Sequence, residues 1–442
     1  MKIAIIGGGL SGLLSALMLE KRGYSPTIYE RLPKVGGVFD SFKRGGVLFD
    51  IGFHYSGAMD KDQYLYNSMQ DLGIIDKLEF EKYNTAFDRL YIDGEVFDIS
   101  LGSKRFKEEL QSRFAQESDN IEEFFQKCYE ASKITSKPEE FLKVDSRRLG
   151  DLLKNIKDEK LKKVFLHFTI FYATKFYEDA SFDFYAKIFI NMLDGTRKIK
   201  GGGGAVIDVI KNELKSTQIK KRSQVDKIFH DQNGVNSLLC KGERVYYDAI
   251  ISTVHPKTTL NMFDMVDKKQ IRYKKHIDSL EESPSLFCIF CLIDAKIESN
   301  LYFYDDEFIS VLPSRTHNGK TVATILSGSL YEDYENLSKE EYKKQKQKEC
   351  DYHLQRLKNL YDFGSIEVLD SSTPMTKQRY SNGYRGSIYG VLCSAKQKSL
   401  SMLMPRTRIE NFYFAGENII APGLIGIFLG VEVLMNYFEE RR

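Results

Sequence analysis

Apolar positions at the start of the chain follow two different periods. Residues 3–6 form an unbroken apolar run, which is typical of a strand buried on both faces of a parallel sheet. Residues 10–21 are mostly good helix formers, and Gly23 ends that segment. Residues 27–29 are β-branched or aromatic at each position, and Glu30 follows them. The pattern predicts one βαβ unit at the beginning of the chain.

Later apolar runs predict further strands and helices. Residues 61–195 are rich in charge and favour helices, whereas short apolar stretches between 285 and 329 favour strands of one sheet. A strand at 412–414 is expected to precede a helix that starts at about residue 424. Asn-Gly and Lys-Gly pairs predict hairpin turns at 233–234 and 241–242. The chain therefore reads as an α/β protein whose end returns to the first sheet.

The turn after the first strand has the pattern of a dinucleotide site. Gly7, Gly9 and Gly12 form G-x-G-x-x-G, in which the first glycine allows a tight turn and the second leaves room for a pyrophosphate. The third lets the helix pack close to the sheet. Leu10 and Ser11 lie in the first turn of that helix, whose free N–H groups and dipole favour phosphate. We expect these five residues to hold a dinucleotide.

An acidic residue and a second glycine pair extend this motif. Glu30 follows at close to the spacing of about 20 residues expected for the acid that binds ribose hydroxyl groups. A carboxylate there suits a free 2′-hydroxyl group and argues against NADP. Gly36 and Gly37 allow another close backbone approach to an extended ligand, and Arg31 offers a planar set of donors to phosphate.

Composition excludes several classes of function. The chain has 442 residues, which is too long for a single hydrophobic core. Its net charge of +2 gives no electrostatic footprint for a nucleic acid, and no Cys/His spacing predicts a metal site. No signal peptide and no bilayer-spanning run is found, so a cytoplasmic location is expected.

Cys288 and Cys291 form a C-x-x-C pair that could be a redox centre. They lie in an apolar run that predicts a strand, where residues three apart point to opposite faces. The structural interpretation is therefore favoured.

Residues 161–193 are unusually rich in phenylalanine and tyrosine. A buried helix pair at a domain core explains such a segment. Two functional interpretations stay open beside it. The segment could line a long apolar tunnel, or it could dip into a lipid surface with Lys162, Lys163, Lys175 and Lys187 around it. The last interpretation implies peripheral contact with the inner face of a membrane.

The run from Glu30 to Gly37, followed by Phe49-Asp50-Ile51-Gly52, resembles the flavin amine oxidase and phytoene desaturase superfamily. The resemblance implies FAD as cofactor, bound by a Rossmann-type domain into which a substrate domain of mixed sheet and helices is inserted. It places Arg31, Gly36 and Gly37 over the pyrophosphate and ribityl region.

Two later blocks match the same superfamily in the same order. The middle block contains the strand valine whose backbone holds the adenine. The last block contains a strand, an acidic residue near the ribityl chain, and a glycine-bearing helix whose start faces the flavin. The implied FAD-binding positions are Val225, Gly416, Glu417, Gly423, Ile425 and Gly426.

The resemblance also divides the chain. Residues 1–60, 195–260 and 400–442 are expected to form a discontinuous FAD-binding domain, and residues 61–194 and 261–399 a substrate-binding domain.

Within the superfamily, residues 49–57 and 372–390 resemble retinol saturases and carotenoid isomerases. This resemblance implies saturation, desaturation or isomerisation of double bonds in an apolar polyene. An amine oxidase-like enzyme, a redox-neutral isomerase and a non-enzymatic flavoprotein stay as alternatives, and the electron donor or acceptor stays open. His54 and Tyr55 are the candidate proton-handling residues, because they follow the Gly52 turn that the superfamily places beside the flavin. His54 could equally shape that loop.

Overall fold

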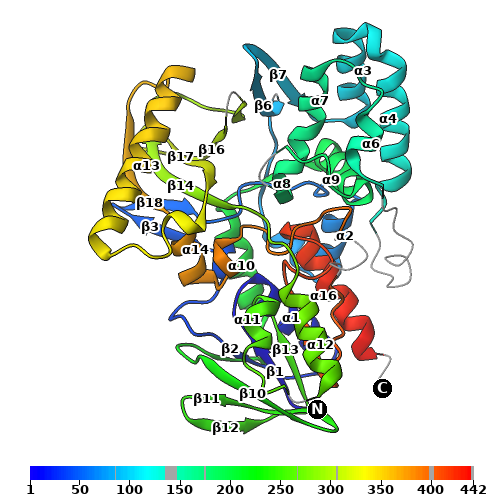
Figure 1. Ribbon diagram of the computed structural model, residues 1–442, viewed down its shortest axis with the longest axis vertical. Helices are drawn as coiled ribbons and strands as arrows, with labels where there is room; N and C mark the ends of the chain where they lie inside the picture. Colours follow the sequence, from blue (N-terminus) through cyan, green and yellow to red (C-terminus); the bar gives the residue numbers. More distant parts are fainter. Residues whose placement is uncertain are drawn as a thin grey trace.

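The computed structural model describes residues 1–84, 86–134, 147–173, 176–265, 267–304, 307–397 and 403–439. Two large sheets dominate it. One lies at the end of the molecule that holds the N-terminus, and the other lies at the opposite end beside a group of helices (Figure 1). The protein is an α/β structure, as the sequence predicted.

The first sheet is five-stranded and entirely parallel, with the order β19-β13-β1-β2-β9. Its strands are β1 (Ile3–Ile6), β2 (Thr27–Tyr29), β9 (Gln218–Lys220), β13 (Ala249–Ser252) and β19 (Phe412–Phe414). The helices of this region are α1 (Leu10–Glu20), α10 (Gly202–Glu213) and α16 (Gly423–Glu439). The predicted βαβ unit and the return of the chain's end are confirmed.

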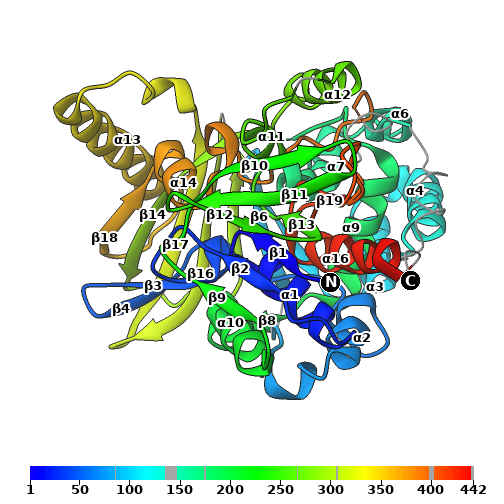
Figure 2. The same cartoon turned by 90° about the horizontal axis from the view of Figure 1, so that it is seen from below.

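Both faces of β1 are buried, which explains its unbroken apolar run. Ile3 and Ile5 pack with α1, α10 and α16, whereas Ala4 and Ile6 face the opposite layer. That layer contains the antiparallel strands β10 (Val225–Asp231), β11 (Gly234–Cys240) and β12 (Glu243–Tyr246), as Figure 2 shows. Helices α11 (Pro256–Leu260) and α12 (Lys268–Asp278) complete it. The predicted turn at 241–242 is confirmed, and the other turn lies one residue earlier than predicted, at 232–233, because Gly234 already pairs with Asp231.

The second sheet is seven-stranded and mixed, with the order β18-β14-β17-β16-β15-β6-β7. Its strands are β6 (Ala86–Ile92), β7 (Glu95–Ser100), β14 (Ser285–Ile293), β15 (Asn300–Tyr304), β16 (Phe308–His317), β17 (Lys320–Ser329) and β18 (Ile366–Ser372). One face is covered by α13 (Lys339–Leu360). The hairpin of β3 (Ser41–Arg44) and β4 (Val47–Asp50) packs on the other face.

The prediction that residues 61–195 are helical is wrong for part of this segment, because β6 and β7 belong to the sheet. Asp93 and Gly94 both have positive φ angles (48° and 77°), which makes them the turn between these strands. An Asp-Gly pair between two apolar runs is a strong hairpin signal. The high charge of the surrounding segment masked it.

Most of the rest of that segment is helical. It contains α2 (Tyr64–Asp71), α3 (Ser103–Arg113), α4 (Ser118–Ala131), α6 (Leu149–Leu153), α7 (Glu159–Leu166), α8 (Ile170–Ala173) and α9 (Phe182–Gly195). Short strands β5 (Phe80–Glu81) and β8 (Lys198–Ile199) pair with each other. Helix α14 (Pro374–Ser381) follows β18.

The aromatic segment 161–193 forms mainly a core. Its fully buried rings are Phe165, Phe168, Tyr172, Phe182, Tyr185 and Phe189. Among its lysines, Lys163 pairs with Asp93 and Lys187 with Asp183. Lys162 pairs with Glu159, and Lys175 lies outside the described residues. No helix in the described part of the chain is long and apolar enough to cross a bilayer.

Cys288 and Cys291 lie on opposite faces of β14, and all six cysteines are free thiols. Burial raises the pKa of Cys288 to about 11 and also raises the pKa of Cys291. A thiol that stays protonated is a poor nucleophile. The structural interpretation of this pair is confirmed.

Candidate functional site

The first glycine turn is shaped by two different requirements. Gly7 has a φ angle of 102°, and a Cβ added to Gly12 would lie 2.0 Å from the Gly7 carbonyl oxygen. Protein packing therefore requires both glycines. Gly9 is different: its backbone is extended (φ −71°), and an added Cβ would meet no atom closer than 4.0 Å, the Cα of Gly37. The space above Gly9 is left for a ligand.

The second glycine turn meets the first. The N–H group of Gly36 donates to the Gly8 carbonyl oxygen (2.8 Å), and an added Cβ on Gly37 would lie 3.2 Å from the Cα of Gly9. Gly36 and Gly37 have φ angles of 120° and 60°, in the left-handed region. Two turns of bare backbone thus form one continuous cradle.

Helix α1 begins at this cradle without a side-chain cap. The first N–H groups of a helix have no partner within it, so those of Leu10, Ser11 and Gly12 are available to an anion. No acidic side chain lies in this first turn. The helix start therefore offers partial positive charge to phosphate.

Glu30 lies at the end of β2 and is almost fully buried. Its Oε2 accepts a hydrogen bond from the Gly8 N–H group (2.8 Å), and its Oε1 accepts one from Leu32 (2.7 Å). Each carboxylate oxygen keeps a second lone pair for another donor. The Ser223 N–H group donates to the Glu30 carbonyl oxygen (2.8 Å). This bond brings the start of β10, with Val225, next to Glu30.

The C-terminal block closes the same region. Gly416 has a φ angle of 116°, and its added Cβ would lie 3.4 Å from the Ser11 Oγ. The first turn of α16 is equally tight, since a Cβ on Gly426 would lie 1.9 Å from the Ala421 carbonyl oxygen. The predicted positions of this block that line the adjoining cavity are Glu417, Gly423, Ile425 and Gly426.

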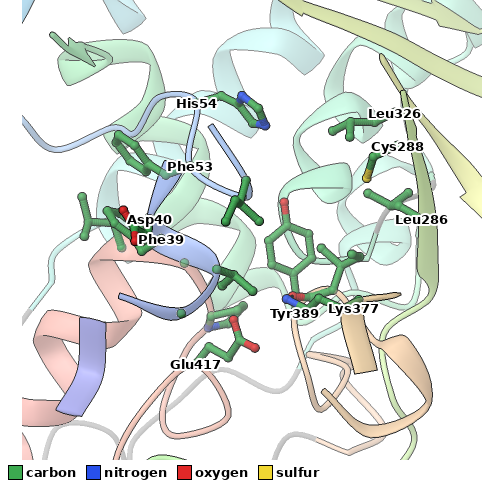
Figure 3. Close-up of a pocket in the computed structure, with 18 of the residues that line it drawn as sticks. Phe39, Asp40, Phe53, His54, Leu286, Cys288, Leu326, Lys377, Tyr389 and Glu417 are labelled. Carbon is green, nitrogen blue, oxygen red and sulfur yellow. The ribbon is translucent and has the colours of Figure 1, made fainter. Parts of the chain in front are cut away.

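A cavity of about 1340 Å³ extends from these loops to the seven-stranded sheet. Arg31 and Gly37 line its nucleotide end, where the Arg31 guanidinium donates to the Arg379 carbonyl oxygen. Figure 3 shows Phe53 and His54 on one wall, with Leu286 and Leu326 on the opposite wall. The rest of the wall is mostly apolar and includes Phe171, Phe184, Ile188, Phe290, Phe308 and Leu312. The aromatic segment therefore contributes to a cavity wall as well as to the core.

His54 faces this cavity as a neutral imidazole. Burial lowers its pKa to about 4; the Asp50 charge opposes this shift and the Lys198 charge adds to it. The Nδ1 atom is buried and has no hydrogen-bond partner among the described residues. Burial of the ring among protein atoms therefore favours the uncharged imidazole.

Tyr55 lines the cavity with its ring, but its hydroxyl group is already bonded. It donates to Asp88 Oδ1 (2.9 Å) and lies 2.6 Å from the Tyr302 hydroxyl oxygen. Burial and the Asp88 charge raise the pKa of Tyr55 well above its ordinary value. Tyr55 therefore stays protonated.

Asp88 is the centre of a polar cluster that sequence reasoning missed. It is fully buried, and it also interacts with His167 Nε2 (3.0 Å) and Asn300 Nδ2 (2.8 Å). The His167 Nδ1 atom lies 2.7 Å from the Tyr304 hydroxyl oxygen. A signal was present: Asp88 occupies a position between Ala86 and Leu90, the buried phase of β6. Its partners could not be found from sequence spacing.

The sequence profile of the flavin containing amine oxidoreductase family matches residues 10–426. The chain belongs to this family. It is an FAD-dependent oxidoreductase, and the cradle fits the cofactor, because the open space above Gly9 and the uncapped start of α1 suit a dinucleotide. When bound, FAD supplies hydride-transfer chemistry.

Known proteins with similar sequences and structures agree with this assignment. The chain is 22% identical to all-trans-retinol 13,14-reductase of Danio rerio, over 96% of this chain and 84% of that protein. It is 22% identical to 4,4'-diapophytoene desaturase (4,4'-diaponeurosporene-forming) of Staphylococcus haemolyticus, over 75% of this chain and 70% of that protein. An oxidoreductase from Methanosarcina mazei has the same fold (TM-score 0.75, 18% identity, 99% of this chain and 100% of that chain).

Proposed function

We propose that this enzyme saturates, desaturates or isomerises carbon–carbon double bonds of an apolar polyene or related isoprenoid lipid. The observation that carries the proposal is the large, mainly apolar cavity that adjoins the glycine cradle. A long hydrocarbon has few polar groups, so burial in an apolar cavity supplies most of its binding energy. Two relatives are named for retinol and diapophytoene, which are substrates of this kind.

A small cationic amine fits this cavity less well. A cationic substrate is held most strongly by a carboxylate that has no other cationic partner. The cavity acids Asp40, Asp183 and Asp370 already have cationic partners, which are Lys34, Lys187 and Arg44. Glu417 is left, at the end where the cofactor is expected to bind. The amine oxidase alternative is therefore the weaker of the two.

The predicted cofactor contacts form part of the proposal. Gly9, the first turn of α1 and Arg31 would hold the pyrophosphate, Glu30 the ribose, and the backbone at Val225 the adenine. Gly416, Glu417 and the start of α16 would face the ribityl chain and flavin. The division into an FAD-binding part (1–60, 195–260 and 400–442) and a substrate-binding part (61–194 and 261–399) stays a prediction of the same kind.

His54 is proposed as the residue that takes up or holds a proton next to the substrate. With a pKa of about 4 it is unprotonated at neutral pH, so it can accept a proton but cannot donate one as an imidazolium. Tyr55 supports the wall instead, because its hydroxyl group is committed to Asp88.

Peripheral contact with the inner face of a membrane stays a prediction. Most rings of residues 161–193 are buried, so that segment offers less surface for lipid than its sequence indicated. Flotation of the protein with liposomes, compared between the wild type and the Phe171→Ser/Phe176→Ser variant, tests it. Recovery of the wild type in the soluble fraction at low salt would remove membrane contact from the account.

Product analysis tests the proposed reaction. Oxidised and reduced enzyme are incubated without oxygen with a set of polyenes, and products are separated by chromatography and mass. We expect a change of two hydrogens, or a new isomer of the same mass, in at least one polyene. Oxidation of small amines with formation of hydrogen peroxide, and no change in any polyene, would contradict the proposal.

A further inference from the structure

One half-buried lysine of the cavity wall differs from the other two. Lys377 lies in the middle of α14, lines the cavity and is half-buried. The one hydrogen bond from its Nζ to a described residue goes to the Ile388 carbonyl oxygen and is long (3.4 Å). No carboxylate of the described part of the chain forms an ion pair with it.

The other half-buried lysines of the wall have acidic partners. The Nζ of Lys187 lies 2.8 Å from Asp183, and that of Lys346 lies 3.7 Å from Asp370. A half-buried ammonium group without an anion has lost part of its hydration and gained little in return. Lys377 therefore has an unused capacity to bind an anion.

The groups around Lys377 do not supply that anion. The nearby Cys288 stays a neutral thiol, because burial raises its pKa to about 11 even though the Lys377 charge opposes the shift. Tyr389 stays a neutral phenol, because burial, and to a smaller degree the Glu417 charge, raise its pKa. Glu417 itself lines the cavity but forms no ion pair with Lys377.

Tyr389 lies beside Lys377 on the cavity wall. It follows Ile388, whose carbonyl oxygen accepts the Lys377 bond, and Figure 3 shows both side chains on one part of the cavity wall. No hydrogen bond of its hydroxyl group to a described residue is found, although its N–H group is bonded to Ser283. Leu286, Cys288 and Leu326 form the wall beyond this pair in the same view.

We propose that Lys377 binds the carboxylate of the substrate, which is therefore a long unsaturated acid and not a hydrocarbon or an alcohol. An ammonium–carboxylate contact in a largely apolar cavity is a charge-assisted hydrogen bond, and it fixes one end of an otherwise featureless chain. This inference rests on the proposed function, from which it takes the premise that the rest of the substrate is an unsaturated hydrocarbon chain. The choice of the acid depends on Lys377 alone.

Binding of a matched pair of ligands tests it. All-trans-retinoic acid and all-trans-retinol share one polyene chain and differ in the terminal group. Each is titrated into the FAD-loaded enzyme, and the dissociation constant is read from the polyene absorption. We expect the wild type to prefer the acid. The Lys377→Met variant should bind the acid roughly tenfold to a hundredfold more weakly and the alcohol almost unchanged.

Two further variants separate charge from packing. Lys377→Arg keeps the cation and should keep the preference for the acid. Lys346→Met removes a cation that already lies near Asp370, and should bind the acid within about twofold of wild type.

Several results would overturn the proposal. These are a wild type with no preference for the acid, equal weakening of both ligands in Lys377→Met, or a changed flavin spectrum in that variant with an unchanged acid-to-alcohol ratio. The last result would assign Lys377 to the cofactor. Because binding is measured without turnover, an enzyme that prefers the acid but changes no double bond would refute the proposed reaction and leave the carboxylate site intact.

Discussion

The two ends of the cavity are built in different ways. At the nucleotide end, residues 7–12 and 30–37 are close in sequence, and backbone geometry together with the Glu30 side chain gives the cradle its shape. At the other end, the wall combines side chains from β14, β15, β17 and α8, which are far apart in the chain. The first end has room for a ligand because Gly9 has no side chain. The shape of the second end depends on which side chains line it.

This difference shows which residues determine cofactor binding and which determine substrate binding. A cofactor that must be held in one way needs a local, repeatable backbone structure. A substrate wall can change with single side chains while the strands behind it stay the same. Substitutions in the cradle should therefore affect cofactor content, and substitutions in the wall should affect turnover or stability with the cofactor still bound.

Gly9→Val should give the largest effect, the loss of FAD binding. The backbone at Gly9 suits any residue and an added Cβ would meet no protein atom closer than 4.0 Å, so the variant should fold. Its side chain would fill the place kept for the pyrophosphate. FAD content after purification measures cofactor binding, and thermal melting of the apoprotein measures whether the variant folds. A yellow Gly9→Val protein with normal FAD content would refute the role of the cradle.

His54→Ala should keep the flavin spectrum and lower the rate by about 10²–10⁴-fold, as expected for loss of a proton-handling group. Its pH dependence is informative. A histidine with a pKa of about 4 in the folded state and 6.5 when exposed makes the unfolded state bind more protons between these values. Stability of the wild type should therefore fall as pH decreases from 6.5 towards 4. The variant should lose this component, and normal turnover in it would leave His54 a structural residue.

Glu30→Ala should weaken FAD binding by about 1.5–3 kcal/mol, the range for a hydrogen bond to a charged group. Part of this loss would come from the Gly8 and Leu32 N–H groups, which Glu30 also orients. Titration of the apoprotein with FAD gives the affinity. The matched control is Glu79→Ala, which removes an exposed acid that pairs with Lys200. Equal FAD affinity of the wild type and Glu30→Ala would remove Glu30 from ribose binding.

Asp88→Asn should change FAD binding least among these variants, and it should lower the stability of the fold by a measurable amount. Tyr55, His167 and Asn300 would lose a charged acceptor, at a cost of about 1–3 kcal/mol in the free energy of unfolding. Asp98→Asn, at an exposed position on the neighbouring strand, is the control. Denaturant unfolding compares the two. A larger loss for Asp98→Asn would mean that the buried cluster is not a support of the wall.

The sequence predicted the cradle well because each of its requirements is local. The strand β1, the glycines and the start of α1 follow one another within a few residues. The hairpin of β6 and β7 was missed although Asp93-Gly94 marks its turn, because the charge around it outweighed that signal. The Asp88 cluster could not be predicted, since β6 pairs with β15 across more than 200 residues of chain. The neutral state of His54 likewise depends on burial, which no local pattern gives.

Anaerobic mixing of the FAD-loaded enzyme with a polyene tests the central claim most directly. The oxidised and the chemically reduced enzyme are each mixed with a polyene and with a small amine, and the flavin absorption is followed through a single turnover. The account predicts that a polyene bleaches the oxidised flavin or restores the absorption of the reduced one, or is isomerised by the reduced enzyme, and that the amine changes nothing. Rapid bleaching of the oxidised flavin by the amine, with no response to any polyene in either state, would contradict it.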